Sequence, residues 1–277
     1  MKEVNSLDEL RNARISLDPT VGFVPTMGSL HEGHLSLIRQ AKDECKSVVV
    51  SIFVNPTQFG PNEDLSKYPR DLKRDLDLIR PLGVDLVWTP TPEIMYPQGY
   101  QTWVEVEALT KRLEGALRPG HFKGVTTVVA KLFNAVQPHK AYFGQKDAQQ
   151  AAVIRQMTRD LNFPIEVIVC ATVREADGLA MSSRNKYLEG DDRKAARVLF
   201  RALSAAKDAY EKGIRDAEML RTIMKDTLAS EPRAQLQDVS CADYDTLEEL
   251  DVINGKTLLS MAVRFGKTRL IDNFVLE

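Results

Sequence analysis

Apolar residues in the first part of the chain fall into two alternating patterns. Compact apolar runs without polar alternation, such as residues 21–26 and 47–54, predict strands buried on both faces of a parallel sheet. Segments in which apolar residues recur every three or four positions, such as Leu35 to Cys45, predict helices that cover such a sheet. The alternation predicts an α/β fold with a doubly wound, Rossmann-like parallel sheet.

The same patterns continue to residue 171, where the character of the chain changes. Ser6 and Glu9 have the spacing of a capping box and predict an N-terminal helix. Further strands are expected at 84–89, 140–143 and 165–171, further helices at 72–79, 125–136 and 147–161, later helices at 192–212 and 216–229, and β-like runs at 235–242, 257–263 and 269–275. We therefore expect a Rossmann-like domain at residues 1–175 and a smaller α+β C-terminal domain at residues 176–277.

Composition and charge are those of an ordinary globular chain. Of 277 residues, 43% are hydrophobic and 27% charged, close to globular averages. Lysine and arginine number 37 against 39 acidic residues, so the net charge of −2 offers no global attraction to polyanions. Nucleic acid and membrane are therefore disfavoured as main partners.

The cysteines and the N-terminal residues bear on cellular location. Cys45, Cys170 and Cys241 lie far apart, with neither a CxxC pair nor the spacing of a disulfide framework, which favours a reducing cytoplasm. The first residues are charged, and no apolar run has the length of a signal-peptide core or a membrane span. We expect an unprocessed cytoplasmic protein.

Residues 25–34, PTMGSLHEGH, lie between a predicted strand and a predicted helix. In an open α/β sheet, ligands bind at the carboxyl ends of the strands, which is where this segment lies. Gly28 and Gly33 allow the backbone to approach a ligand closely. The helix N-terminus favours phosphate, while His31 and His34 can donate N–H bonds to charge that develops during phosphoryl or nucleotidyl transfer. The alternative is that the two histidines only cap and decorate a loop, because short motifs often match by chance.

Two other interpretations of short motifs fit less well. A zinc site of the helical metalloprotease type needs histidines four residues apart, whereas His31 and His34 are three apart. The Gly-Lys-Thr triplets at residues 255–257 and 266–268 lack the upstream glycine of a P-loop. We expect both triplets in turns beside strands.

Two further segments follow predicted strands. Residues 55–60, NPTQFG, can bind substrate hydroxyl or carboxylate groups, or can simply form the turn that Asn-Pro initiates. Residues 143–150, FGQKDAQQ, place Lys146 where a phosphate needs neutralising. Asp147 and Gln150 of this segment also fit a helix N-cap and its N3 partner, a purely structural role.

The polar loop at residues 178–185, GLAMSSRN, lies at the expected domain boundary. Its two serine hydroxyls and the Arg184 guanidinium can donate to pyrophosphate oxygens, or the loop can be an exposed linker. A Gly-rich basic turn at residues 118–124, RPGHFKG, can add positive charge or merely connect elements.

In this order the segments resemble the blocks of the pantoate–β-alanine ligase family, across essentially the whole chain. The blocks are PTMGSLHEGH, VNPTQFGPNEDL, LRPGHFKGV, FGQKDAQQ and MSSRN. Their joint occurrence is far more specific than the histidine pair alone. The chain departs from the residues usual in the family at Ser29, Thr57, Gln145 and Ala148.

The resemblance implies a nucleotidyltransferase-type Rossmann domain, a C-terminal lid domain and a homodimer. It implies a two-step reaction that uses Mg²⁺ and ATP. The carboxylate of pantoate attacks the α-phosphorus of ATP to give pantoyl adenylate and pyrophosphate. The amine of β-alanine then attacks the acyl carbon and releases AMP.

The resemblance also implies roles for the residues at matching positions. His34, His31 and Lys146 would be catalytic, and Gln58, Gln150 and Met27 would bind pantoate. The ATP site would contain Met27, Gly28, His31, His34, Gly144, Gln145, Lys146, Asp147, Val173, Met181, Ser182, Ser183 and Arg184. The Mg²⁺ ligands and the group that takes the proton of the β-alanine amine are unknown from the sequence.

Three other functions remain open at the level of the sequence. A cytidylyl- or adenylyltransferase would use the same histidine chemistry and keep the nucleotide on its product. A synthetase-like RNA-binding module is disfavoured by the acidic balance of the chain. A catalytically silent nucleotide-binding protein would retain the loops without turnover.

Overall fold

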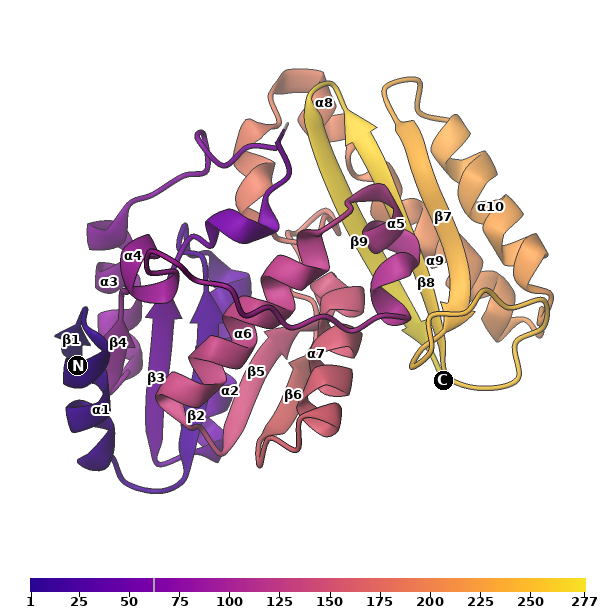
Figure 1. Cartoon of the computed structure of the whole chain (residues 1–277). Coiled ribbons are helices and arrows are strands. Elements are labelled where there is room, and N and C mark those ends of the chain that lie inside the picture. The colour runs from indigo at the N-terminus through magenta and orange to yellow at the C-terminus, as the bar shows by residue number, and fades with distance from the viewer. Residues whose placement is uncertain (62) are drawn as a thin grey trace. The chain divides into compact units, whose positions relative to one another are not determined.

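The computed structural model describes residues 1–61 and 63–277, which form two compact units (Figure 1). Unit 1 consists of Met1–Lys111, Gly115–Gly144 and Val153–Ala171, and unit 2 of Arg112–Glu114, Gln145–Ala152 and Thr172–Glu277. Each unit has its own sheet and its own apolar core. Asn62, within the second block of the family resemblance, lies outside the described residues.

Unit 1 contains a six-stranded parallel sheet in the order β1-β4-β3-β2-β5-β6. The strands are β1 Lys2–Val4, β2 Val21–Thr26, β3 Ser47–Ile52, β4 Leu86–Trp88, β5 Lys140–Gly144 and β6 Glu166–Cys170. The chain leaves the central strand β2 toward β3 and β4, and later returns to the other side of β2 as β5. Neighbouring strands whose connections run in opposite directions create a topological switch point, which lies here between β2 and β5.

Helices cover both faces of the sheet of unit 1 (Figure 1). Residues of α2 Glu32–Glu44 and α3 Leu72–Ile79 pack on one face with Val24, Val50 and Val87. On the other face, α6 His121–Val136 brings Phe133 within 6.4 Å of Phe143, measured between ring centroids. The remaining helices of the first 171 residues are α1 Leu7–Ile15, α4 Pro92–Met95, α5 Leu113–Leu117 and α7 Ala148–Asp160, with 3₁₀ turns η1 Pro56–Gln58, η2 Arg80–Leu82, η3 Leu109–Lys111 and η4 Gln145–Asp147.

Unit 2 contains an antiparallel sheet in the order β7-β8-β9, formed by β7 Gln235–Asp243, β8 Thr257–Phe265 and β9 Thr268–Leu276. Apolar residues of α9 Val198–Glu211 and α10 Ala217–Ala229 pack with this sheet in a single core. The unit also includes α8 Gly190–Ala195 and the 3₁₀ turn η5 Ser183–Tyr187. Within the same unit, η4 is hydrogen-bonded to β9, so the turn that carries Lys146 rests on this second sheet.

The predicted fold class is confirmed: a doubly wound parallel sheet with a smaller α+β part. The expectation of one helix at residues 192–212 was wrong, because the chain breaks between α8 and α9. No proline or glycine marks that break. The strand β1 was not predicted, since its sequence Lys-Glu-Val has no apolar pattern. In the part of the chain that the structure describes, no helix combines the length and apolar character needed to cross a membrane.

Candidate functional site

The carboxyl edge of the sheet of unit 1 collects the first two predicted binding segments and Gly144. Thr26 at the end of β2 is in register with Ile52 at the end of β3, so residues 25–34 and 55–60 leave neighbouring strands at one edge. Gly144 ends β5, which pairs with β2 on its other side. The switch point of the sheet therefore lies among the residues that the sequence singles out.

His31 and His34 open α2 and satisfy its first N–H groups. The Nδ1 atom of His31 accepts a hydrogen bond from the Gly33 N–H at 3.2 Å, and Nδ1 of His34 accepts one from the His31 N–H at 3.4 Å. The ring centroids are 4.1 Å apart. Because both Nδ1 atoms are acceptors, the proton of each neutral imidazole resides on Nε2. The capping role is real, and it uses Nδ1 of each ring and not the Nε2–H donor.

Asp75 fixes the loop that leads into these histidines. Its carboxylate is 1% exposed and accepts hydrogen bonds from the backbone N–H groups of Ser29 and Leu30, both at 2.8 Å. The side chain of Arg74 donates to the Leu30 carbonyl at 3.2 Å, so one turn of α3 binds both the N–H and the carbonyl groups of the loop. Gly28 has a φ of +77°, and a Cβ there would lie 3.0 Å from the Asp75 carboxylate, so glycine is needed at this position.

Gln58 is held beside Met27 by the amide of Asn55. The Asn55 Nδ2 atom donates to Gln58 Oε1 at 3.1 Å, and Gln58 Nε2 lies 3.1 Å from the sulfur of Met27. The Asn55 side-chain carbonyl oxygen accepts from the Tyr96 hydroxyl at 2.8 Å. Burial raises the pKa of Tyr96 to about 12, so this hydroxyl stays protonated and able to donate at neutral pH. The predicted substrate-binding pair Met27 and Gln58 is thus brought together in unit 1.

The basic segment at residues 118–124, whose last four residues begin α6, contacts the backbone of Gln58. The Nδ1 atom of His121 lies 2.8 Å from the Gln58 carbonyl oxygen. Arg118 forms a bidentate ion pair with Glu63, with both N–O distances 2.7 Å. Burial is the largest single influence on Glu63 and opposes its ionisation, but the hydrogen bond and the charge of Arg118, together with the Gly60 N–H and His121, outweigh it, so the pKa of Glu63 is lowered. The charge of Arg118 is therefore paired with Glu63 inside unit 1 and links residues 118–124 to the segment that contains Glu63.

Gly124 allows α6 to pack directly on η1. A Cβ at Gly124 would lie 2.4 Å from the carbonyl oxygen of Thr57, a distance at which the backbone must move. The Gly124 carbonyl oxygen also accepts from Asn55 Nδ2 at 3.1 Å. The close approach of helix and turn is what places the Asn55 amide between Gln58 and α6.

Unit 2 holds the other predicted binding residues. Lys146 and Asp147 lie in η4, with Lys146 Nζ 3.3 Å from an Asp147 carboxylate oxygen. Gln150 lies in the first turn of α7, which follows η4 directly. Among the remaining predicted residues, Met181, Ser182, Ser183 and Arg184 belong to the polar loop, whose last residues begin η5, and Val173 lies just before the loop.

The polar loop folds back on the residues that precede it, within unit 2. Arg174 and Ala180 form an antiparallel bridge, and the Met181 N–H donates to the Val173 carbonyl at 3.0 Å. The Ser182 hydroxyl accepts from the Arg184 N–H at 3.2 Å and so caps η5. The segment is therefore a shaped turn with a capped start, rather than an exposed linker.

Comparisons with known proteins give one answer over the full length. A family model described as Pantoate-beta-alanine ligase matches residues 1–275. A pantothenate synthetase of Herpetosiphon aurantiacus is 60% identical over 277 residues, covering 100% of both chains. The crystal structure of pantothenate synthetase from Thermus thermophilus has a TM-score of 0.95 at 48% identity and covers 99% of both chains. This chain belongs to the pantoate–β-alanine ligase family.

A pantoate–β-alanine ligase from Francisella tularensis is also similar to this chain. Its crystal structure is described as a complex with beta-gamma ATP and beta-alanine, and it matches with a TM-score of 0.81 at 37% identity. The match covers 99% of this chain and 97% of that one. The resemblance stated from the sequence blocks is confirmed by these matches.

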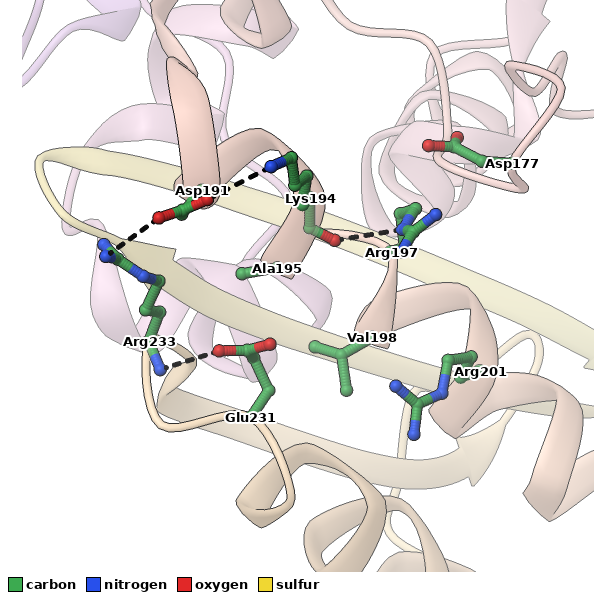
Figure 2. A pocket seen from close by; sticks show the side chains of 9 residues that line it. All are labelled: Asp177, Asp191, Lys194, Ala195, Arg197, Val198, Arg201, Glu231 and Arg233. Atoms are coloured by element: carbon green, nitrogen blue, oxygen red, sulfur yellow. Dashed lines mark hydrogen bonds and ion pairs between the residues drawn. The ribbon is translucent and has the colours of Figure 1, made fainter.

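A pocket of about 600 Å³ in unit 2 contains none of the residues predicted from the family blocks (Figure 2). Its charged side chains largely engage one another: Lys194 lies 3.3 Å and Arg233 3.6 Å from carboxylate oxygens of Asp191. The motif residues therefore remain the candidate site, and this pocket is not part of it. The lining residues are Asp177, Asp191, Lys194, Ala195, Arg197, Val198, Arg201, Glu231 and Arg233.

The sequence analysis did not identify the residues that support the candidate site. Asp75 carries no motif by itself, Asn55 opened a candidate segment but was given no supporting role, and the 118–124 turn was left between a charge-supplying and a connecting role. The distinguishing signal for Asn55 was its place at the carboxyl end of β3. For Asp75, an acidic residue on the buried side of α3, the apolar spacing of Leu72, Leu76 and Ile79 was the only clue.

Proposed function

We propose that this chain joins pantoate to β-alanine at the expense of ATP, through a pantoyl-adenylate intermediate, with release of AMP and pyrophosphate. The observation that carries the proposal is the pair His31 and His34 at the start of α2. Their Nδ1 atoms are engaged by backbone N–H groups at the switch-point edge of the sheet. Membership in the pantoate–β-alanine ligase family over residues 1–275 supplies the acid and the amine.

The first step needs alignment and charge neutralisation more than a strong base. A carboxylic acid with a pKa of about 4 is already ionised at neutral pH. A pantoate carboxylate oxygen forms a bond to the α-phosphorus, and the bond from that phosphorus to the bridging oxygen of pyrophosphate breaks. The Nε2–H groups of His31 and His34 donate to the oxygens whose charge grows in this step, with His34 as the main catalytic residue.

The remaining assignments follow the chemistry of each side chain. Gln58 and Met27 bind pantoate in unit 1, with the Gln58 amide oriented by Asn55. In unit 2, Lys146 neutralises the α-phosphate, and Gln150 binds the pantoate carboxylate. The ATP contacts come from Gly28 and Gly144 in unit 1 and from Gln145, Asp147, Val173, Met181, Ser182, Ser183 and Arg184 in unit 2.

The second step forms the amide bond. The neutral amine of β-alanine attacks the acyl carbon, the carbon–oxygen bond to the phosphate breaks, and AMP leaves with the bonding electrons. The nitrogen loses a proton as the amide forms. The same donors that stabilise charge on the α-phosphate in the first step stabilise it on the departing AMP.

Mg²⁺ is proposed to enter with ATP. Magnesium usually keeps several waters and binds substrate phosphates plus one or two carboxylates. A hard oxygen ligand of this kind is present in η4, where the half-exposed Asp147 carboxylate lies beside Lys146. The ion would supply positive charge to the leaving pyrophosphate. Among residues 1–61 and 63–277, no group of three or more histidine, cysteine or acidic side chains is arranged to hold a metal ion.

The division into a domain of residues 1–175 and a lid domain of residues 176–277 is part of the proposal, as are the homodimer and the cytoplasmic location. Three free, buried cysteines support a reducing compartment. Burial raises the pKa of Cys170 to about 11 and that of Cys241 to about 12, so both stay as thiols.

The proposal is tested with purified protein, ATP, Mg²⁺, pantoate and β-alanine, each omitted in turn, with products followed by mass spectrometry. We expect pantothenate and AMP in equal amounts only when every component is present. A stable nucleotidyl product would instead support a nucleotidyltransferase. Absence of any turnover would favour the silent nucleotide-binding protein.

A further inference from the structure

Two adjacent polar residues on the last strand, Asp272 and Asn273, are almost completely buried. Asp272 is 1% exposed and Asn273 is 4% exposed. Buried polar side chains are retained only where hydrogen bonds offset the loss of water. In both residues those hydrogen bonds lead to segments of unit 2 that are proposed to bind ATP.

The Asn273 carboxamide is bonded to η4 through all of its polar groups. Its Nδ2 atom donates to the carbonyl oxygens of Gln145, at 3.0 Å, and of Lys146, at 2.9 Å. Its Oδ1 atom accepts from the Gln145 side-chain amide at 3.0 Å. An asparagine offers two N–H donors and one carbonyl, which is the combination this turn uses. The backbone on both sides of Lys146 is therefore fastened to β9.

The Asp272 carboxylate binds the loop that precedes η5. Arg174 forms a bidentate ion pair with it, at 2.7 and 2.9 Å, and also donates to the Gly178 carbonyl at 2.9 Å. The Arg174 guanidinium lies 5.1 Å from the Phe200 ring centroid and 4.9 Å from that of Phe274. A planar guanidinium held by a carboxylate and two rings has little freedom. The loop is thereby anchored to the same strand.

We propose that Asp272 and Asn273 are positioning residues, which hold η4 and the 174–180 loop in one fixed relation so that Lys146 is presented correctly to the α-phosphate. The inference rests on the role proposed for Lys146. A lysine side chain is long and flexible, so its direction depends on a fixed backbone beneath it. A misplacement of about 1 Å at a reacting centre can cost about a hundredfold in rate.

Asn273 is the better position for a test than Asp272. Removing Asp272 would leave the charge of Arg174, whose side chain is only 16% exposed, uncompensated, and this strongly destabilises a protein. Asn273→Asp keeps the size of the side chain but replaces two N–H donors with an oxygen that faces two carbonyl oxygens. We choose the pantoate-dependent exchange of labelled pyrophosphate into ATP as the measurement, because it reports adenylate formation alone.

The experiment is a double-mutant cycle with Lys146→Ala. In the wild-type background we expect Asn273→Asp to lower the exchange rate about tenfold, whereas in the Lys146→Ala background it should change the rate less than about twofold. A residue that acts through Lys146 gives this non-additive pattern. A general structural role would lower the rate by the same factor in both backgrounds, and that result would overturn the inference, as would an unchanged rate in Asn273→Asp.

Controls separate positioning from loss of fold and from failure of the proposed function. Ser240→Ala, at a fully buried hydroxyl of β7 in the same sheet, should leave the exchange rate within about twofold.

If Asn273→Asp does not fold, Arg174→Lys replaces it in the same cycle, since it keeps the charge beside Asp272 but loses the fork that reaches Gly178. It should raise the KM for ATP about tenfold with the KM for pantoate unchanged, and equal changes in both KM values, or none, would overturn the inference. Wild-type protein without exchange would refute the proposed function itself.

Discussion

His31 has a structural role and a proposed chemical role in one imidazole, and the two roles use different nitrogen atoms. Nδ1 caps α2 by accepting a hydrogen bond from the Gly33 N–H, and the Nε2–H group is the donor that is proposed to bind ATP. The structural alternative considered from the sequence is therefore correct for Nδ1 and leaves the chemistry at Nε2 open to test. A substitution that keeps a cap and removes the Nε2 donor separates the roles.

We predict that His31→Asn keeps the stability of the protein and lowers its activity. Asparagine is among the best N-cap residues, so the free energy of unfolding should change by no more than about 0.5 kcal/mol. Loss of the Nε2–H donor should lower the rate of adenylate formation at least about tenfold. Urea unfolding and pyrophosphate exchange measure the two effects. Full activity in a stable variant would mean that His31 only caps the helix.

For His34 we predict a larger loss. His34→Ala should lower adenylate formation about a hundredfold, equivalent to about 3 kcal/mol of transition-state stabilisation. The accompanying loss of the bond to the His31 N–H should cost only about 1 kcal/mol of stability. Single-turnover kinetics at saturating ATP, beside a thermal melt, will check both. Turnover at the wild-type rate would remove His34 from the mechanism.

Asp75 is predicted to matter for stability and for activity together. Asp75→Asn replaces one carboxylate oxygen with an N–H group that faces a backbone N–H, and should cost about 2 kcal/mol of unfolding free energy. The loop before His31 should then loosen, and pyrophosphate exchange should fall. Asp71→Asn is the matched control, because Asp71 caps the same helix and asparagine caps equally well. Equal stability of both variants would contradict the anchoring role.

At the scale of elements, the contact between α6 and η1 decides where Gln58 lies. Gly124→Ala would put a methyl group 2.4 Å from the Thr57 carbonyl oxygen and force helix and turn apart. We expect a loss of about 1–3 kcal/mol in stability and a raised KM for pantoate. Gly255→Ala, where no atom lies within 4 Å of the added carbon, should change neither. An unchanged pantoate KM in Gly124→Ala would separate this packing from the substrate site.

The ion pair between Glu63 and Arg118 gives the same region a pH dependence. The folded-state pKa of Glu63 is lowered, so its contribution to stability is present above the unfolded-state pKa of about 4.3 and is lost as pH falls through the folded-state value. Wild type should therefore exceed Glu63→Gln by about 1 kcal/mol at pH 7, and the difference should vanish in strong acid. Urea unfolding at a series of pH values below 7 measures it, and a difference that does not shrink as the pH falls would contradict the ion-pair account.

The elements that could be predicted from the sequence are those whose apolar pattern is dictated by burial. The bounds expected for β2 were confirmed residue for residue, because every position of that strand except one is buried and the pattern has no ambiguity. The capping box of Ser6 and Glu9 was confirmed for a similar reason, since both halves are local. The break between α8 and α9 and the strand β1 could not be predicted, because tertiary contacts and not local sequence determine them.

The residues of the candidate site also divide into those that local sequence identifies and those that only tertiary contacts identify. Motif residues such as His31 and Lys146 stand out by type and spacing, whereas Asp75, Asn55 and Asn273 act through contacts that join positions far apart in the chain. Asn273 lies 127 residues from the Lys146 carbonyl that it binds. No local pattern in a single sequence encodes such a pairing. The contributions of these three residues became visible only in the folded chain.

At the scale of the whole molecule, the fold explains why the proposed chemistry is divided between two sets of residues. A parallel sheet gathers the histidines and Gln58 at its carboxyl edge in unit 1. An antiparallel sheet in unit 2 carries the Lys146 turn and the 174–184 segment on its last strand. The family relation over residues 1–275 means that both sets are part of one inherited architecture.

The central claim is that a carboxylate is activated by transfer of AMP, and oxygen labelling tests it most directly. Pantoate with ¹⁸O in both carboxylate oxygens is converted with ATP and β-alanine. The ¹⁸O content of the AMP, and of any inorganic phosphate, is then measured by mass spectrometry. The account predicts one ¹⁸O atom in each AMP, because the carboxylate oxygen that attacks the α-phosphorus stays with it when the amide forms. Label in inorganic phosphate with unlabelled nucleotide would contradict the adenylate mechanism.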